Sequence, residues 1–137
     1  MDNAQLHRII QRLPRLREKY LGCFPPEFMI KSLPYNTFQI VRVDSGAYIG
    51  HFVVFINRNG VYYFGDSSGT HIDDYFELHD CYKHKVVHIT HKQLQAYDYM
   101  CAWWCIYFAH LAYHGFIKMK DINYNSMHRF ASIHMNL

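Results

Sequence analysis

The sequence predicts an α+β domain, and two stretches of the chain carry that prediction. Residues 101–115 would be apolar on nearly every side of a helix, so we expect this helix to be buried at the domain centre. Earlier in the chain, two runs rich in β-branched and aromatic residues flank Asn59 and Gly60, the strongest short signal for a β-hairpin. A sheet packed against one central helix is therefore expected.

The other elements follow in chain order. An amphipathic helix is predicted at residues 3–13, because apolar residues recur there with helical spacing until Pro14. Glycine and proline make 21–34 a loop-rich segment, and alternating residues make 38–43 the first strand. After the hairpin strands at 48–57 and 61–66, the patterns predict a two-turn helix, a last strand and a C-terminal helix, within residues 72–78, 85–90 and 116–137 respectively.

Length and composition are typical of one globular domain spanning residues 1–137. Half of the residues are hydrophobic and 18% are charged, so the chain can bury one core but is too short for two. We expect no signal peptide and no membrane segment, because no apolar run reaches transmembrane length. The four cysteines lack the spacing of a secreted scaffold, which favours an intracellular protein with reduced thiols.

The chain is mildly basic, with a formal net charge of +3 before its 11 histidines are counted. The positive charge is concentrated between His7 and Lys19. Such a run is more often a solvated helix face than a nucleic-acid patch, because no aromatic or glycine residues are interleaved with it. Any DNA binding is expected to be weak, non-specific and sensitive to salt.

Three candidate active-site residues follow from the predicted elements. Cys101 would lie in the first turn of the central helix, where unpaired N–H groups can lower a thiol pKa. If Asn59 and Gly60 form the hairpin loop, Asp66 lies diagonally next to His51 on the same face of the sheet. The alternatives are a cysteine that only fills the core and two polar strand ends that never meet.

The many histidines raise the question of a metal site. On one helix, Cys101 and Cys105 share a face, whereas His110 and His114 point to roughly the opposite one, so one tetrahedral zinc could not bind all four. A second group lacks any zinc-finger spacing and consists of His79, Cys81, His84, His88 and His91. We therefore expect no metal.

The chain order of His51, Asp66, Gln95 and Cys101 resembles that of the adenain family, the adenovirus-type cysteine proteases. It is more distantly similar to the SUMO-specific proteases that share the adenain fold. The resemblance extends over about residues 19–115 and is carried by three blocks, which are GHFVVF at 50–55, YYFGDSSG at 62–69, and Gln95 shortly before Cys101 and its aromatic helix.

This resemblance implies a papain-like or adenain-like fold, with a small mixed sheet, flanking helices and the nucleophile at the start of the central helix. It implies that His51 is the base, Asp66 orients it, Cys101 is the nucleophile and Gln95 donates to the oxyanion. The implied activity is that of a thiol endopeptidase that processes virion precursor proteins at Gly-rich sites. The resemblance implies a location in the host cell, including its nucleus, and in the virion.

Cofactors and partners are also expectations at this point. The chemistry requires no cofactor, the protein should be a monomer without membrane contact, and DNA or a peptide could act as an activator, as in adenovirus enzymes. Two alternatives stay open, a SUMO or ubiquitin-like-protein deconjugating protease and a catalytically inactive binding module. Candidates at all four positions argue against the inactive module. Ala102 departs from the family glycine after the nucleophile, and Met100 departs from the acidic residue of the SUMO branch.

Overall fold

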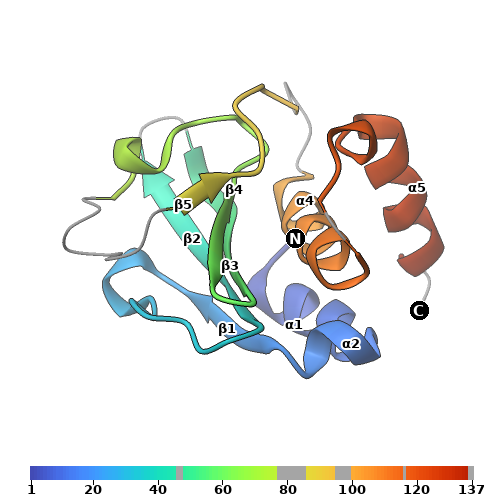
Figure 1. Ribbon diagram of the computed structural model, residues 1–137, viewed down its shortest axis with the longest axis horizontal. Helices are drawn as coiled ribbons and strands as arrows, with labels where there is room; N and C mark the ends of the chain where they lie inside the picture. Colours follow the sequence, from blue (N-terminus) through green and yellow to red (C-terminus); the bar gives the residue numbers. More distant parts are fainter. Residues whose placement is uncertain (46–47, 77–85, 95–99, 116, 136–137) are drawn as a thin grey trace.

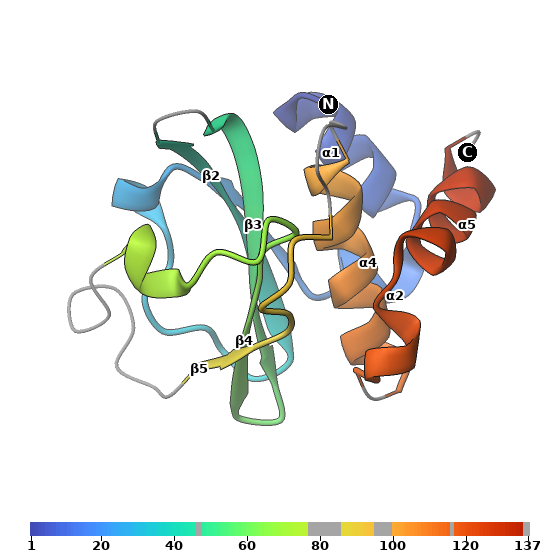
Figure 2. The same cartoon turned by 90° about the horizontal axis from the view of Figure 1, so that it is seen from above.

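A five-stranded mixed sheet forms one layer of the protein, and its α-helices pack together on one side of it (Figures 1 and 2). The computed structural model describes residues 1–45, 48–76, 86–94, 100–115 and 117–135. The strands are β1 (Tyr20–Phe24), β2 (Thr37–Ser45), β3 (Tyr48–Arg58), β4 (Val61–Gly65) and β5 (Val86–His88). The helices are α1 (Asn3–Gln11), α2 (Pro14–Arg17), α4 (Cys101–Tyr113) and α5 (Tyr124–His134), with 3-10 turns η1 (Pro26–Phe28), η2 (Ile72–Asp74) and η3 (Met119–Asp121). The predicted α+β class is confirmed.

The N-terminal region confirms the first predicted helix and corrects the prediction for residues 14–34. Asp2 caps α1 through a reciprocal pair of hydrogen bonds with Gln5, which satisfies two N–H groups at the helix start. Pro14 was expected to end this helix, and in the structure it also begins the short helix α2. A proline is tolerated there because the first turn of a helix loses no hydrogen bond to it. The predicted loop at 21–34 is partly wrong, since β1 pairs there in parallel with β2. A register irregularity between Tyr20 and Cys23 accommodates the glycine in this strand.

The predicted hairpin is confirmed. Val54 pairs with Gly65 and Arg58 pairs with Val61, so the register is the one that a two-residue loop requires. Both loop residues have positive φ, which is 52° at Asn59 and 88° at Gly60. The strand predicted at 38–43 is present as β2, but it is the second strand rather than the first, because β1 precedes it.

The later elements are shorter than the patterns suggested. The predicted two-turn helix at 72–78 is one turn of 3-10 helix, η2, and residues 77–78 lie outside the described part. The predicted last strand is present as β5 and pairs in parallel with β4, so the sheet is mixed. The C-terminal helix is confirmed as α5, capped by the side chain of Asn123.

Helix α4 is the centre of the main core. Nine of its residues are buried, and they occupy every side of the helix, as its composition predicted. Alternate residues of β3 point toward it, and the intervening ones enter a second core on the opposite face of the sheet. The helix ends at Tyr113, two residues before Gly115, whose φ is 148°. Among the described residues, no helix combines the length and the apolar character needed to cross a membrane.

The contact between the hairpin and α4 leaves no room for a side chain at Gly65. A Cβ there would lie 2.6 Å from Cδ2 of Phe108 and 2.9 Å from Cγ1 of Val54, and both neighbours are fully buried. We predict that Gly65→Ala lowers the free energy of unfolding by about 1–3 kcal/mol in urea denaturation, because the packed core must move. The control is Met119→Ala at an exposed position, expected to change it by less than about 0.5 kcal/mol. Equal effects would contradict the tight packing.

Candidate active site

Cys101 is the first residue of α4, and its side chain is partly exposed. Burial alone would raise the pKa of this thiol. Hydrogen bonds with His51 and with the backbone of Phe52 and Ala102, together with the charge of His51, outweigh burial and lower the pKa below its ordinary value. The position at a helix start, expected from the sequence, thus coincides with donors that favour a thiolate.

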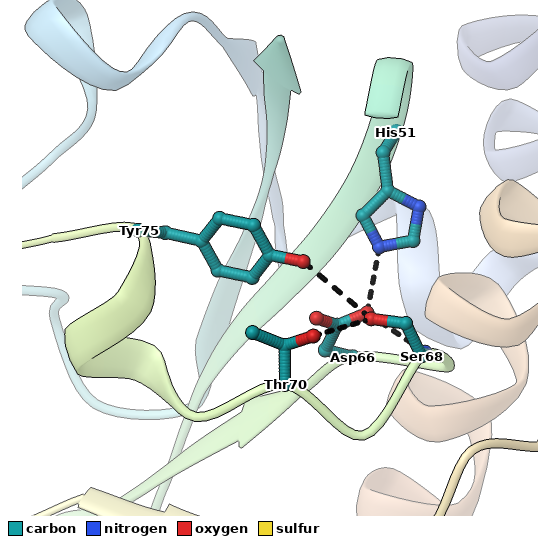
Figure 3. A network of polar contacts seen from close by, with 5 residues as sticks. All are labelled: His51, Asp66, Ser68, Thr70 and Tyr75. Carbon is teal, nitrogen blue, oxygen red and sulfur yellow. Dashed lines mark hydrogen bonds and ion pairs between the residues drawn. The ribbon is translucent and has the colours of Figure 1, made fainter. Parts of the chain in front are cut away.

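His51 lies near the start of β3 and links the cysteine to a carboxylate. Its Nε2 is 2.6 Å from Oδ1 of Asp66, and both side chains are buried (Figure 3). Because Nε2 faces Asp66, Nδ1 is the ring nitrogen that remains for Cys101. Burial lowers the pKa of His51, but hydrogen bonds with Asp66 and Cys101 and the charges of these two groups raise it to about 9.

Asp66 follows directly after the last residue of β4. Its Oδ1 also accepts a hydrogen bond from the backbone N–H of Ser68 at 2.9 Å. Burial would raise the pKa of this carboxyl, whereas the bond and charge of His51 and the hydrogen bonds with Ser68 lower it. The expected contact between His51 and Asp66 is therefore present, with the carboxylate ionised and the imidazole protonated near neutral pH.

Three hydroxyl groups form a small cluster near the carboxylate. The hydroxyl oxygen of Ser68 is 2.9 Å from that of Thr70 and 3.4 Å from that of Tyr75 (Figure 3). The ring of Tyr75 also lies beside that of His51, with 6.4 Å between centroids. Burial raises the pKa of Tyr75 to about 12, so its hydroxyl keeps its proton. No sequence pattern indicated this contact, because Tyr75 comes from the end of the η2 turn.

The turn after Asp66 also holds the segment that leads toward Gln95. The N–H of Leu94 donates to the carbonyl of Ser67 at 2.8 Å. A Cβ at Gly69, where φ is 74°, would lie 2.6 Å from the carbonyl carbon of Lys92, so only glycine permits this approach. Gln95 itself falls within residues 95–99, outside the described part of the chain. The sequence signal for this contact was Gly69 itself, the glycine that ends the polar turn after Asp66.

The other described cysteines have a different chemistry from Cys101. Cys105 lies one helical turn deeper and is 1% exposed, and burial raises its pKa well above the ordinary value. Burial likewise raises the pKa of Cys23 to about 11. Of the three cysteines that the structure describes, Cys101 alone has a lowered pKa. Cys81 lies outside the described residues.

The histidine groups have packing and hydrogen-bonding roles. The rings of His110 and His114 lie 4.2 Å apart between centroids, and burial, followed by the charge of His114, lowers the pKa of His110 to about 4. His88 accepts a hydrogen bond from the N–H of Ile72. In the described ranges, no three His, Cys, Asp or Glu side chains are grouped so that they could hold a metal ion. Three members of the second group, His79, Cys81 and His84, fall outside those ranges.

No protein-family model matches this chain, and no curated protein matches it. The functional assignment therefore rests on the geometry of the site. A thiol with a lowered pKa, an imidazole that can exchange a proton with it, and a carboxylate that orients the imidazole are the parts of an activated nucleophile. His51 supplies its part from β3, Asp66 from the residue after β4, and Cys101 from the first residue of α4.

The shifted pKa values give a test that needs no substrate. We predict that iodoacetamide alkylates Cys101 at about pH 6, below the ordinary thiol pKa of about 8.5, and leaves Cys23 and Cys105 unmodified. His51→Ala removes the charge that stabilises the thiolate, so alkylation should slow about tenfold for each unit by which the thiol pKa rises. Mass spectrometry of tryptic peptides measures the rate at each cysteine. Comparable labelling of Cys105 would rule out selective activation of Cys101.

Proposed function

We propose that this protein is a cysteine endopeptidase with Cys101 as nucleophile, His51 as general base and acid, and Asp66 as the residue that orients His51. One observation carries the proposal. Asp66 is hydrogen-bonded to His51 at 2.6 Å, and His51 in turn lowers the pKa of Cys101, the first residue of a buried helix. The pKa of the thiol is lowered and that of the imidazole is raised to about 9, so the pair is shifted toward the thiolate and the imidazolium.

The chemistry follows from that pair. The thiolate of Cys101 attacks the carbonyl carbon of a peptide bond, and His51 then gives its proton to the leaving amine. The product of this step is an acyl-enzyme thioester. His51, now neutral, removes a proton from a water molecule, and the resulting hydroxide attacks the thioester and releases the carboxylic acid and the thiolate. Asp66 holds the imidazole ring in the orientation that both proton transfers need.

The negative charge that develops on the carbonyl oxygen needs donors. The first turn of α4 has backbone N–H groups without partners in the helix, and the helix dipole favours negative charge at this end. The resemblance assigns a further donor to Gln95, in a segment whose start the turn at Gly69 anchors. One such donor is typically worth about 10²–10³ in rate. We include Gln95 in the proposed site on that basis.

The wider proposal is an adenain-like protease of papain-like fold, acting on virion precursor proteins at Gly-rich sites. It is supported by the chain order of the histidine, the acid and the cysteine, and by the mixed sheet beside the helix of the nucleophile. Ala102 in place of the family glycine keeps a small side chain and an N–H after the nucleophile. The substrate class is the one that the resemblance implies.

Two cysteines on one helix provide a matched pair of variants. We predict that Cys101→Ala abolishes cleavage of fluorogenic Gly-rich peptides, because no nucleophile remains. Cys105→Ala, one turn deeper in the same helix, should keep substantial activity, since its buried thiol does not enter the reaction. Circular dichroism of both variants checks that the fold is retained. Equal loss of activity in the two variants would indicate a structural role for both cysteines and refute the assignment.

Asp66→Asn tests the orienting carboxylate through the pH profile. The substitution should reduce kcat/KM by orders of magnitude, up to about 10⁴, because a neutral amide stabilises the imidazolium less. Since the carboxylate helps raise the pKa of His51 to about 9, the alkaline limb of the profile should move to lower pH. Asp73→Asn is the control, at an exposed carboxylate beside His71. If Asp73→Asn caused the same loss, Asp66 would not be the orienting residue.

A further inference from the structure

A groove of about 400 Å³ lies next to the first turn of the helix that carries the nucleophile. It is bounded by α1, by the start of α4 and by the end of α5. Met100, which directly precedes Cys101, lines it. Figure 2 shows the start of α4 at the same end of the helix layer as the start of α1 and the end of α5. A polypeptide seated in this groove would therefore pass the start of α4 at Met100, one residue before Cys101.

One face of α1 provides the charge of the groove. Gln5, Arg8, Ile9 and Arg12 follow helical spacing along this face, whereas Leu6 and Ile10 are buried on the other. Arg8 and Arg12 are both exposed. Across the described ranges, no carboxylate lies within ion-pair distance of either guanidinium. Two cations one helical turn apart are thus available to a ligand.

The floor of the groove is apolar. Met100 is half-buried, Trp103 is 5% exposed, and the side chain of Met135 at the end of α5 is 51% exposed. Methionine side chains are flexible and adapt to apolar groups of different shape. The combination of two accessible guanidinium groups with a methionine-lined floor suits a ligand that carries both a carboxylate and an apolar side chain.

We infer that this groove binds the part of the substrate polypeptide that flanks the scissile bond, and that it selects segments containing an acidic residue beside an apolar one. The inference rests on the proposed peptidase function and adds a substrate class to it. A guanidinium group can bind a carboxylate through two parallel hydrogen bonds, which gives selectivity for Asp or Glu over their amides. A nucleic acid fits less well, because the indole of Trp103 is too buried to stack with bases.

The experiment separates binding from cleavage. Binding is measured with the Cys101→Ala protein and fluorescent octapeptide libraries in which one position at a time is fixed as Glu, Gln or Lys. We expect Glu to bind at least about fivefold more tightly than Gln at one or two adjacent positions. The double variant Arg8→Gln/Arg12→Gln should lose this preference. The matched control Arg15→Gln/Arg17→Gln, on α2, removes the same charge and should keep it.

Each outcome decides one of the two proposals. The groove assignment would be overturned if no Glu preference were found. It would also be overturned if the preference survived in the Arg8→Gln/Arg12→Gln protein, or if the control variant lost it to the same extent. Loss of duplex DNA binding in that double variant, with peptide preferences unchanged, would make the groove a phosphate site and would also overturn the groove assignment.

If wild-type protein cleaves library peptides without a Glu preference, the peptidase proposal stands and the groove assignment fails. If the preference depends on Arg8 and Arg12 but nothing is cleaved, the peptidase proposal fails and the groove stands.

Discussion

The hydrogen bond between His51 and Asp66 is the interaction on which the proposed site depends. Burial opposes charge on both groups, yet pairing raises the pKa of His51 to about 9 and lowers that of Asp66. The two groups stabilise the fold in different pH ranges. The contribution of Asp66 is present above its unfolded pKa of about 4 and is lost as pH falls; that of His51 is present below about 6.5 and is lost as pH rises through 9. The pair therefore favours the folded chain most between about pH 4 and pH 6.5, where both contributions are present.

The geometry of this pair depends on backbone features that carry no chemistry themselves. The Asn59-Gly60 loop fixes the register of β3 and β4, which brings the residue after Gly65 beside His51. Gly65 lets the hairpin approach Phe108, so the sheet and the helix that carries Cys101 meet at close range. Gly69 performs the same task for the segment at Lys92. Gly60 and Gly65 thus help to set the positions of the acid, the base and the nucleophile, and Gly69 sets that of the segment at Lys92.

Much of this arrangement was predictable from local signals. The hairpin register followed from one dipeptide, and the buried helix followed from its uniform apolar character, so the contact of His51 with Asp66 and the place of Cys101 were expected. β1 was missed because its glycine and the prolines after it resemble a loop, while its parallel pairing with β2 is a distant contact. The arginines of α1 looked like a solvated face, because the sequence does not reveal that α1 lines a groove together with Met100 and Trp103 of the α4 region. Gln95 remains a prediction.

Helix α4 receives its packing from both ends of the sequence. Leu16 of the N-terminal region belongs to the same core, and Phe130 of α5 contacts Trp103 and Tyr107 edge-on or tilted, at 6.4 and 5.3 Å between ring centroids. During synthesis on a ribosome, the N-terminal helices and the sheet emerge first and α5 emerges after the helix it covers. A nascent chain would therefore carry Cys101 on a helix with one flank open to water. Because α5 is translated last, the helix that carries Cys101 would be fully packed only after α5 has docked. This order would delay the moment at which the proposed protease could cleave neighbouring proteins.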